Sequence, residues 1–301
     1  MGGDVNTRLE LSLLALLALL WGSSYLFIKV AVAEIPPITL IAARVFGAAL
    51  LLMIVLWLRG ERLPRDRTTW GLLTVQAFFN SIAAWTVLAW GQQFVDAGLA
   101  SVLNSTSPIF VLLIALAATN RQRPPMIKVA GALIGIVGVV LVIGVDRLRG
   151  LGQQVAGQIA CLIGAALYAC AALFGTRFND LGPVVTATGT MIIATVALLP
   201  IAFAFDRPWQ LAPSYAAIVA TLFLSIFCTG LAMLLYFRLL RTLGSLGVAS
   251  QAYLRAGVGV ALGAIILGES LSPVVAIGLL ATILGVAMIN WPSSDNRRQR
   301  R

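Results

Sequence analysis

The sequence predicts an all-α membrane protein of ten transmembrane helices, arranged as two inverted five-helix repeats around a central cavity. Three observations support this prediction. Hydrophobic residues make up 60% of the 301 residues and charged residues only 11%, whereas soluble domains carry about a quarter charged residues. Apolar segments of about 20 residues, the length that crosses a hydrocarbon core, follow one another along the chain. The second half of the chain also repeats the first.

The composition excludes several classes of protein. The net charge is +10, but the basic residues fall between apolar segments or in the tail, which indicates membrane topology and not a nucleic-acid surface. Cys161, Cys170 and Cys228 lie in apolar runs at irregular spacing, which fits neither a disulfide framework nor a zinc site. The chain has no His, the commonest metal ligand and general base. We therefore expect a protein surrounded by lipid, with no cofactor, no metal and no nucleic-acid partner.

Ten apolar segments of helix length can be placed in the chain, separated by short connections rich in Pro, Gly or charge. We expect helices over residues 9–32, 37–58, 68–90, 97–118, 126–145, 155–176, 184–205, 214–237, 247–267 and 273–291. The chain divides accordingly into a first five-helix repeat (1–150), a second, inverted repeat (151–292) and a basic cytoplasmic tail (293–301).

The distribution of Lys and Arg predicts the orientation, because cytoplasmic loops carry an excess of both. With the N-terminus in the cytoplasm, three basic residues face the opposite side: Arg147, Arg149 and Arg207. Fifteen face the cytoplasm: Arg8, Arg59, Arg62, Arg65, Arg67, Arg121, Arg123, Lys128, Arg177, Arg238, Arg241, Arg297, Arg298, Arg300 and Arg301. We therefore place both termini in the cytoplasm.

The internal repeat extends over the whole chain. Phe27 matches Phe174 at an offset of 147 residues, and Gly98 matches Gly247 at an offset of 149. Each unit holds five helices, so the second unit enters the membrane from the opposite side. Many secondary transporters have this inverted-topology repeat, with the substrate site near the bilayer midplane between the two units.

Two matching segments, 98–108 and 247–257, place polar side chains in apolar helices, where such residues are functional candidates by default. Arg255 lies about eight residues into its predicted helix, about 12 Å deep at 1.5 Å per residue. Its rigid guanidinium suits a substrate carboxylate. The alternative is a structural arginine bonded to helix carbonyls. Gln251 shares its face, and Tyr253 lies between them. In the first copy we expect Asn104 and Ser105 to line the site, although such residues also join helices.

Proline and aromatic residues add to this site. Pro108 lacks an N–H, so it leaves the carbonyl of Asn104 without its usual partner and predicts an opened helical turn. Gly257 stands where a matching proline would be, which leaves a second kink undecided. We also assign to the site Asn80, near the midplane of the third helix, and four aromatic residues that either stack on a substrate or pack the core: Trp21, Tyr25, Trp85 and Tyr168.

The remaining charged residues have open roles. Lys29 is close enough to the outer boundary to extend its amine into the interface. Arg44 either lines the cavity or pairs with Glu34, and Glu269 is either a gate or a helix-end charge. Glycines at helical spacing in the fifth and tenth helices predict close packing, with a homodimer interface as one use.

Several of these motifs resemble a known family. Trp21-Gly-Ser-Ser, the 98–108 segment and Leu267-Gly-Glu-Ser-Leu-Ser resemble the EamA repeats of the drug/metabolite transporter superfamily over nearly the whole chain. The overall pattern is most similar to the YddG-type aromatic amino-acid exporters of the bacterial inner membrane. The resemblance implies export of small metabolites, often amino acids; an organic acid or a nucleotide-sugar is the alternative cargo.

The residues also bear on mechanism. No acidic residue lies in the central part of a predicted helix and there is no His, whereas proton-coupled transporters need a titratable chain across the membrane. No Gly-x-x-x-x-Gly-Lys-Ser/Thr loop for ATP is present. We therefore expect facilitated transport by alternating access. An intramembrane enzyme would need clustered Asp, Glu or His at depth, and a purely structural protein would not need a buried arginine. A single arginine in the cavity favours one carboxylate over a multiply charged phosphate.

Overall fold

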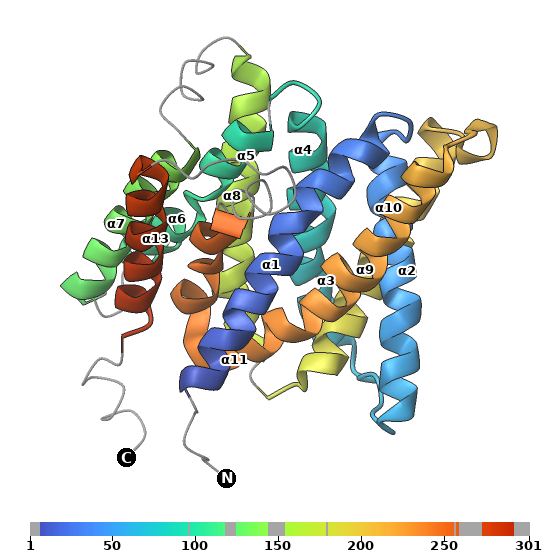
Figure 1. Ribbon diagram of the computed structural model, residues 1–301. Helices are drawn as coiled ribbons and strands as arrows, with labels where there is room; N and C mark the ends of the chain where they lie inside the picture. Colours follow the sequence, from blue (N-terminus) through green and yellow to red (C-terminus); the bar gives the residue numbers. More distant parts are fainter. Residues whose placement is uncertain are drawn as a thin grey trace.

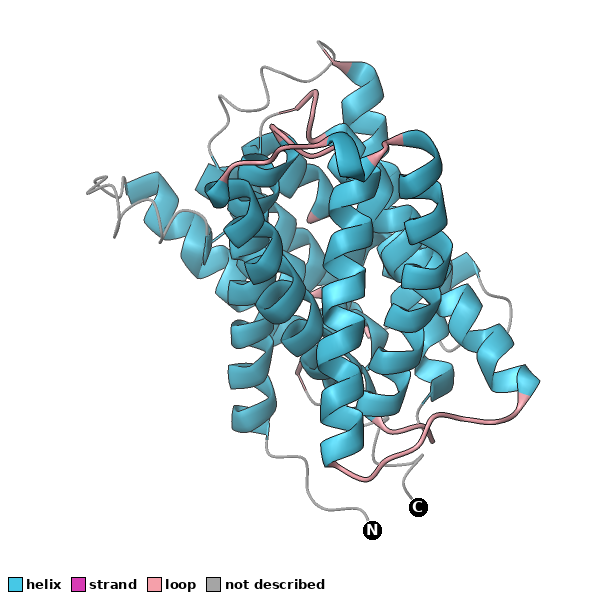
Figure 2. Cartoon of the chain, turned by 90° about the vertical axis from the view of Figure 1, so that its right-hand side faces the viewer, coloured by secondary structure: helices cyan, strands magenta, loops and turns pink. Residues whose placement is uncertain are grey.

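The computed structural model describes residues 7–95, 97–117, 125–143, 154–178, 180–255, 257–258 and 273–291. In this part of the chain all regular structure is helical (Figures 1 and 2). The first half contains α1 (Thr7–Val32), α2 (Pro37–Leu58), α3 (Arg67–Ala77), the π-helix η1 (Phe78–Ile82), α4 (Ala83–Gly91), α5 (Ala97–Asn104), α6 (Ser107–Ala117) and α7 (Met126–Ile143).

The second half follows the same order. It contains α8 (Val155–Gly175), the 3₁₀ turn η3 (Thr176–Phe178), α9 (Pro183–Phe205), the 3₁₀ turn η4 (Pro208–Gln210), α10 (Tyr215–Ser225), the π-helix η5 (Ile226–Leu231), α11 (Ala232–Ala249) and α13 (Pro273–Ile289). Six continuous helical stretches are long and apolar enough to cross a membrane: Thr7–Val32, Pro37–Leu58, Arg67–Gly91, Val155–Phe178, Pro183–Phe205 and Tyr215–Ala249. Residues 256 and 259–267, about half of the ninth predicted helix (247–267), lie outside the described residues.

The two halves share a local irregularity. η1 and η5 interrupt the third helix of each half, and they begin 148 residues apart, at Phe78 and Ile226. π-Helical turns are rare and occur often at functional sites. The separate helices predicted at 214–237 and 247–267 are assigned as continuous up to Ala249, but the backbone departs from helical geometry at Gly244, where φ is 75°. A glycine tolerates this left-handed φ without a Cβ clash.

The first helix of each half packs antiparallel against the third helix of the other half. At the start of α1, Glu10 accepts hydrogen bonds of 2.9 Å from Arg238 and Thr242 in α11. At the other end, Glu34 accepts hydrogen bonds from Ser214, which caps α10. The mirror pairing of α8 with α3–α4 is also antiparallel, because Gly157 approaches Gly91 while Gly175 approaches Gln76.

The helices α7 and α13 form a pair at one edge of the bundle (Figure 1). A Cβ on Gly285 would lie 2.7 Å from the carbonyl oxygen of Gly131, and a Cβ on Gly138 would lie 2.8 Å from that of Gly278. The glycine stripes predicted for close packing therefore join these two helices to each other. The α2–α9 pair is antiparallel as well, since Leu56 packs with Val184 and Thr188 lies against Leu52.

The Glu34 contact makes a prediction about pH. Hydrogen bonds from the Ser214 backbone N–H and hydroxyl, 2.6 and 2.7 Å long, hold the pKa of this carboxyl below its ordinary value. A lowered folded-state pKa stabilises the fold above the unfolded-state pKa, about 4.3, and this stabilisation is lost as pH falls through the folded-state value. We expect Glu34→Gln to melt below wild type at pH 7, and the difference in Tm to vanish near pH 3.

The control for this measurement is Glu61→Gln. Within the described residues Glu61 forms an ion pair only with Arg59, at 3.9 Å, in an exposed connection, and exposed pairs contribute about 0–1 kcal/mol. Its Tm should follow wild type at every pH. A Glu34→Gln difference that stays constant down to pH 3 would show that the charge of Glu34 is not what ties α1 to α10.

Candidate functional site

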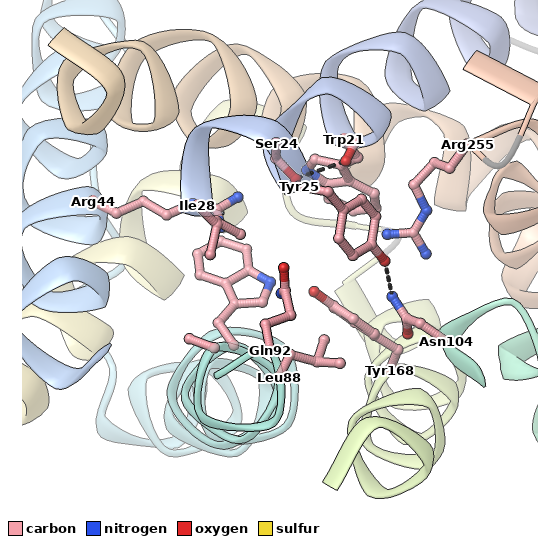
Figure 3. Close-up of a pocket in the computed structure, with 12 residues that line it drawn as sticks. Trp21, Ser24, Tyr25, Ile28, Arg44, Leu88, Gln92, Asn104, Tyr168 and Arg255 are labelled. Carbon is pink, nitrogen blue, oxygen red and sulfur yellow. Dashed lines mark hydrogen bonds between the residues drawn. The ribbon is translucent and has the colours of Figure 1, made fainter. Parts of the chain in front are cut away.

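A small cavity lies between the two halves (Figure 3). Its walls come from α1, α2, α4, the end of α5, α8 and the helical turn at 251–255. The residues that line it are Trp21, Ser24, Tyr25, Ile28, Arg44, Trp85, Leu88, Ala89, Gln92, Asn104, Tyr168 and Arg255. Six of the ten residues predicted for the site are therefore brought together: Trp21, Tyr25, Trp85, Asn104, Tyr168 and Arg255.

Aromatic rings form much of the wall. The Trp21 ring lies 6.4 Å from the ring of Tyr168 and 5.5 Å from that of Tyr236. Its indole N–H donates a 3.0 Å hydrogen bond to the carbonyl oxygen of Cys228, which fixes the ring plane. Buried indoles need such a partner, and the ring faces remain available for stacking. Trp21 therefore separates the cavity from the Tyr236 side of the bundle.

Arg255 is the most unusual member of the site. Its side chain is only 7% exposed, and it makes no hydrogen bond or ion pair with any other residue of the described ranges. Its guanidinium carbon lies 5.8 Å from the ring of Trp21 and 6.0 Å from that of Tyr25. Cation–π contacts contribute about 0.5–2 kcal/mol, far less than the cost of burying an unpaired charge. A guanidinium in this state is ready to bind an anion.

Arg44 supplies a second cation on the opposite side of the cavity (Figure 3). It donates hydrogen bonds to the hydroxyl of Thr229 and to the carbonyl oxygen of Cys228 in η5, and its guanidinium stacks 4.3 Å from the Trp85 ring. Arg44 thus lines the cavity and does not pair with Glu34. The expectation of a single arginine in the cavity is wrong. Within the described chain, no Asp or Glu lines the cavity.

Asn104 contributes a neutral polar group at a helix break. Its amide nitrogen donates a 2.7 Å hydrogen bond to the Tyr25 hydroxyl (Figure 3), while its amide oxygen is buried without a partner among the described residues. The opened turn predicted from Pro108 is confirmed, because α5 ends at Asn104 and α6 begins at Ser107. The matching segment of the second half, 247–257, is also interrupted in its helix, at Ser250, although it has Gly257 in place of the proline.

Four predicted residues lie outside the cavity. Ser105 donates a hydrogen bond to the carbonyl oxygen of Ala252 and so joins the two matching segments. The hydroxyl of Tyr253 bonds the carbonyl oxygen of Ala132, and its ring packs on α7. Gln251 is buried one helical turn from Arg255, and Asn80 points toward Met233. Packing against neighbouring helices, which a single helix does not reveal, explains these four positions.

Five lining residues were not predicted: Ser24, Ile28, Leu88, Ala89 and Gln92. Residues three, four and seven positions apart share one face of a helix. Counting by this spacing from Trp21 gives Ser24 and Ile28 on the same face of α1. Counting from Trp85 gives Leu88, Ala89 and Gln92 on one face of the helical run that contains α4. Lys29 is exposed near the end of α1. Glu269 lies outside the described residues, so its two alternatives remain open.

A bundle of long apolar helices around a buried, doubly cationic and aromatic cavity is typical of a multi-pass membrane transporter. The chain belongs to the EamA-like transporter family, whose model matches it twice, over residues 8–144 and 155–291. The resemblance to EamA repeats is thus confirmed, and the protein is an integral membrane transporter of this type.

Similar proteins agree with this class. The chain is 26% identical over 273 residues to the uncharacterized inner membrane transporter YedA of Escherichia coli strain K12, covering 91% of this chain and 88% of YedA. It is 29% identical to an uncharacterized transporter of Archaeoglobus fulgidus, covering 94% and 97% of the two chains. One protein of known crystal structure aligns over 94% of this chain and 96% of its own, with a TM-score of 0.75 and 18% identity, a likeness of fold alone.

Proposed function

We propose that this protein exports amino acids, aromatic and other large neutral ones, across the bacterial inner membrane by facilitated alternating access. The observation that carries the proposal is the buried guanidinium of Arg255, which has no anionic partner in the described chain and lines an aromatic cavity. Arginine binds carboxylates through two parallel hydrogen bonds. The proposal assigns the protein no catalytic role, in keeping with its family of transporters.

The other cavity groups suit the rest of an amino acid. The unpartnered amide oxygen of Asn104 offers an acceptor to the α-ammonium. The rings of Trp21, Trp85 and Tyr168 offer flat apolar surfaces to a large side chain. These features are consistent with cargo of the YddG-type aromatic exporters, the subfamily that the sequence resembles most.

An organic acid is the second candidate cargo. Two guanidinium groups, those of Arg44 and Arg255, line the cavity, and no carboxylate of the described chain does. A dicarboxylate would satisfy both charges, whereas an amino acid brings a cation of its own. Arg44 already donates to Thr229 and Cys228, so we rank the amino acid first. A nucleotide-sugar is larger and ranks third.

We further propose ten spans in two inverted repeats (1–150 and 151–292) with both termini cytoplasmic and a basic tail at 293–301. The antiparallel packing of α1 with α10–α11 and of α8 with α3–α4 supports the inversion. The excess of Lys and Arg on one side supports the orientation. The apolar α7–α13 edge is the proposed contact if the protein forms a homodimer.

Counterflow in proteoliposomes tests the function directly. Vesicles loaded with one unlabelled amino acid should take up labelled aromatic and large neutral amino acids, faster than labelled dicarboxylates or a nucleotide-sugar. No ATP should be needed, because transport is facilitated. Faster exchange of dicarboxylates would instead identify the organic-acid cargo. Uphill uptake driven by a proton gradient alone would contradict the facilitated mechanism.

A further inference from the structure

We propose that Gln76 and Asn80 form a second substrate subsite, on the cytoplasmic half of the pathway, which is closed in this structure. Both side chains are fully buried, with no exposed surface. Both atoms of the Gln76 amide and the amide oxygen of Asn80 lack a hydrogen-bond partner in the described chain. The inference rests on the proposed transport function and its orientation.

These orphaned groups are expensive in a membrane protein. A buried polar group without a partner costs about 1–3 kcal/mol, and here three such atoms lie within two side chains. The Tyr236 hydroxyl lies beside Gln76 without completing a hydrogen bond to it. Asn80 donates only to the Ser81 hydroxyl and, at 3.5 Å, to the weak acceptor sulfur of Met233. A ligand or water that reaches them in another state would recover this cost.

Gln76 and Asn80 lie where the internal repeat places a second-half counterpart of the cavity. The offset of 148 residues that relates η1 to η5 carries the cavity residues Trp85, Leu88 and Gln92 to Met233, Tyr236 and Leu240. The offset of 147 between the first helices of the halves carries Ile28 to Gly175. The cavity-lining face of the first half therefore has a second-half equivalent made of Gly175, Met233, Tyr236 and Leu240.

These four equivalents are buried and packed at the two amides. A Cβ on Gly175 would lie 3.3 Å from the amide nitrogen of Gln76 and 2.5 Å from Leu240. Met233, Tyr236 and Leu240 belong to the main core cluster. The second half thus has a closed counterpart of the open cavity, and Gln76 and Asn80 are the polar groups that it covers.

The subsite is separate from the cavity. Gln76 and the cavity residue Trp85 are nine residues apart on one helical run, about 13 Å at 1.5 Å per residue. The rings of Trp21 and Tyr236, 5.5 Å between centroids and tilted by 42°, lie at the boundary. At the Glu10 end, Arg238 and Thr242 hold α1 against α11. Parting of these contacts would expose the two amides to the cytoplasm.

The chemistry of the subsite fits the same cargo. Each carboxamide has two N–H donors and one acceptor oxygen, so the pair can bind a carboxylate and an ammonium together. Neither residue carries a charge, unlike the cavity with its two guanidinium groups. The subsite should therefore hold a small carboxylate more loosely than the cavity does.

Thiol labelling tests whether the subsite opens, without any need to know the cargo. Gln76→Cys is made in a chain whose Cys161, Cys170 and Cys228 are replaced by Ala. A membrane-impermeant thiol reagent should label it in inside-out vesicles and not in right-side-out vesicles. The control is Leu73→Cys, since Leu73 is also fully buried on α3 but packs on Gly189; it should stay unlabelled from both sides. No labelling of Gln76→Cys from the cytoplasmic side overturns the proposal.

A substitution then tests binding. Gln76→Leu removes two polar atoms that have no partner in the described chain, so the Tm should stay the same or rise. Uptake from the cytoplasmic side of the best counterflow amino acid should need a concentration at least about three-fold higher for half-saturation. Thr86→Val is the matched control, because the Thr86 hydroxyl is likewise buried without a partner in the described chain and does not line the cavity. An unchanged half-saturation in Gln76→Leu rejects the subsite even if wild-type transport is established. Absence of amino-acid exchange in wild type rejects the proposed cargo and leaves the labelling result to decide the opening.

Discussion

Arg255→Gln is expected to reduce amino-acid counterflow by about 10- to 100-fold. Hydrogen bonds to a charged group contribute about 1.5–3 kcal/mol, and each 1.4 kcal/mol is a factor of ten in affinity. The glutamine keeps polarity and much of the length but loses the charge. Because Arg255 makes no hydrogen bond or ion pair within the described chain, the fold loses little, and the Tm should stay the same or rise.

The paired measurement of counterflow and Tm separates binding from structure. Arg255→Lys keeps the charge without the planar fork, so it should retain part of the activity. A structural arginine, the alternative weighed from the sequence, would instead lower the Tm of Arg255→Gln and leave counterflow per folded molecule unchanged. That result would remove Arg255 from the substrate site.

Gly285→Leu is expected to damage the fold more than any cavity substitution. A Cβ at this position would lie 2.7 Å from the carbonyl oxygen of Gly131 and 2.7 Å from the Cα of Gly135. Both neighbours are backbone, which cannot rotate away, and overpacking costs about 1–3 kcal/mol or more. At roughly 2–4 °C per kcal/mol, we expect the apparent Tm in detergent to fall by about 5–10 °C.

Gly71→Leu is the matched control for this substitution. Gly71 is an exposed helical glycine, and a Cβ there would meet nothing within 4 Å. Its Tm should stay within about 2 °C of wild type. Equal behaviour of the two variants would show that α7 and α13 do not need their close glycine contact.

Much of the fold could be predicted from the sequence, because membrane-spanning helices are recognisable by their length and hydrophobicity. Segment 37–58 was predicted with the bounds that α2 has, and Pro108 correctly predicted the break between α5 and α6. These features depend on local rules of spanning length and missing N–H groups. The π-helical turns η1 and η5 were not predicted, since no local composition marks them.

The site was predictable only in part, because burial alone does not say which neighbour a side chain meets. Trp21 and Arg255, both expected in the site, line the same cavity. Tyr253, two residues before Arg255, was expected in the same site, yet it packs on α7. Arg44 was left undecided between Glu34 and the cavity, because the acceptors that hold it, in η5, are 184 and 185 residues away in sequence. Helix–helix contacts of this range leave no mark in a single sequence.

The measurement that tests the central claim most directly compares L-phenylalanine with L-phenylalaninamide as competitors of counterflow. The two differ only in the group that Arg255 is proposed to bind. The account predicts that the carboxylate competes at least about ten-fold better in wild type, the equivalent of one charge-assisted hydrogen bond, and that the preference disappears in Arg255→Gln. Equal competition by the amide and the carboxylate in wild type would contradict it.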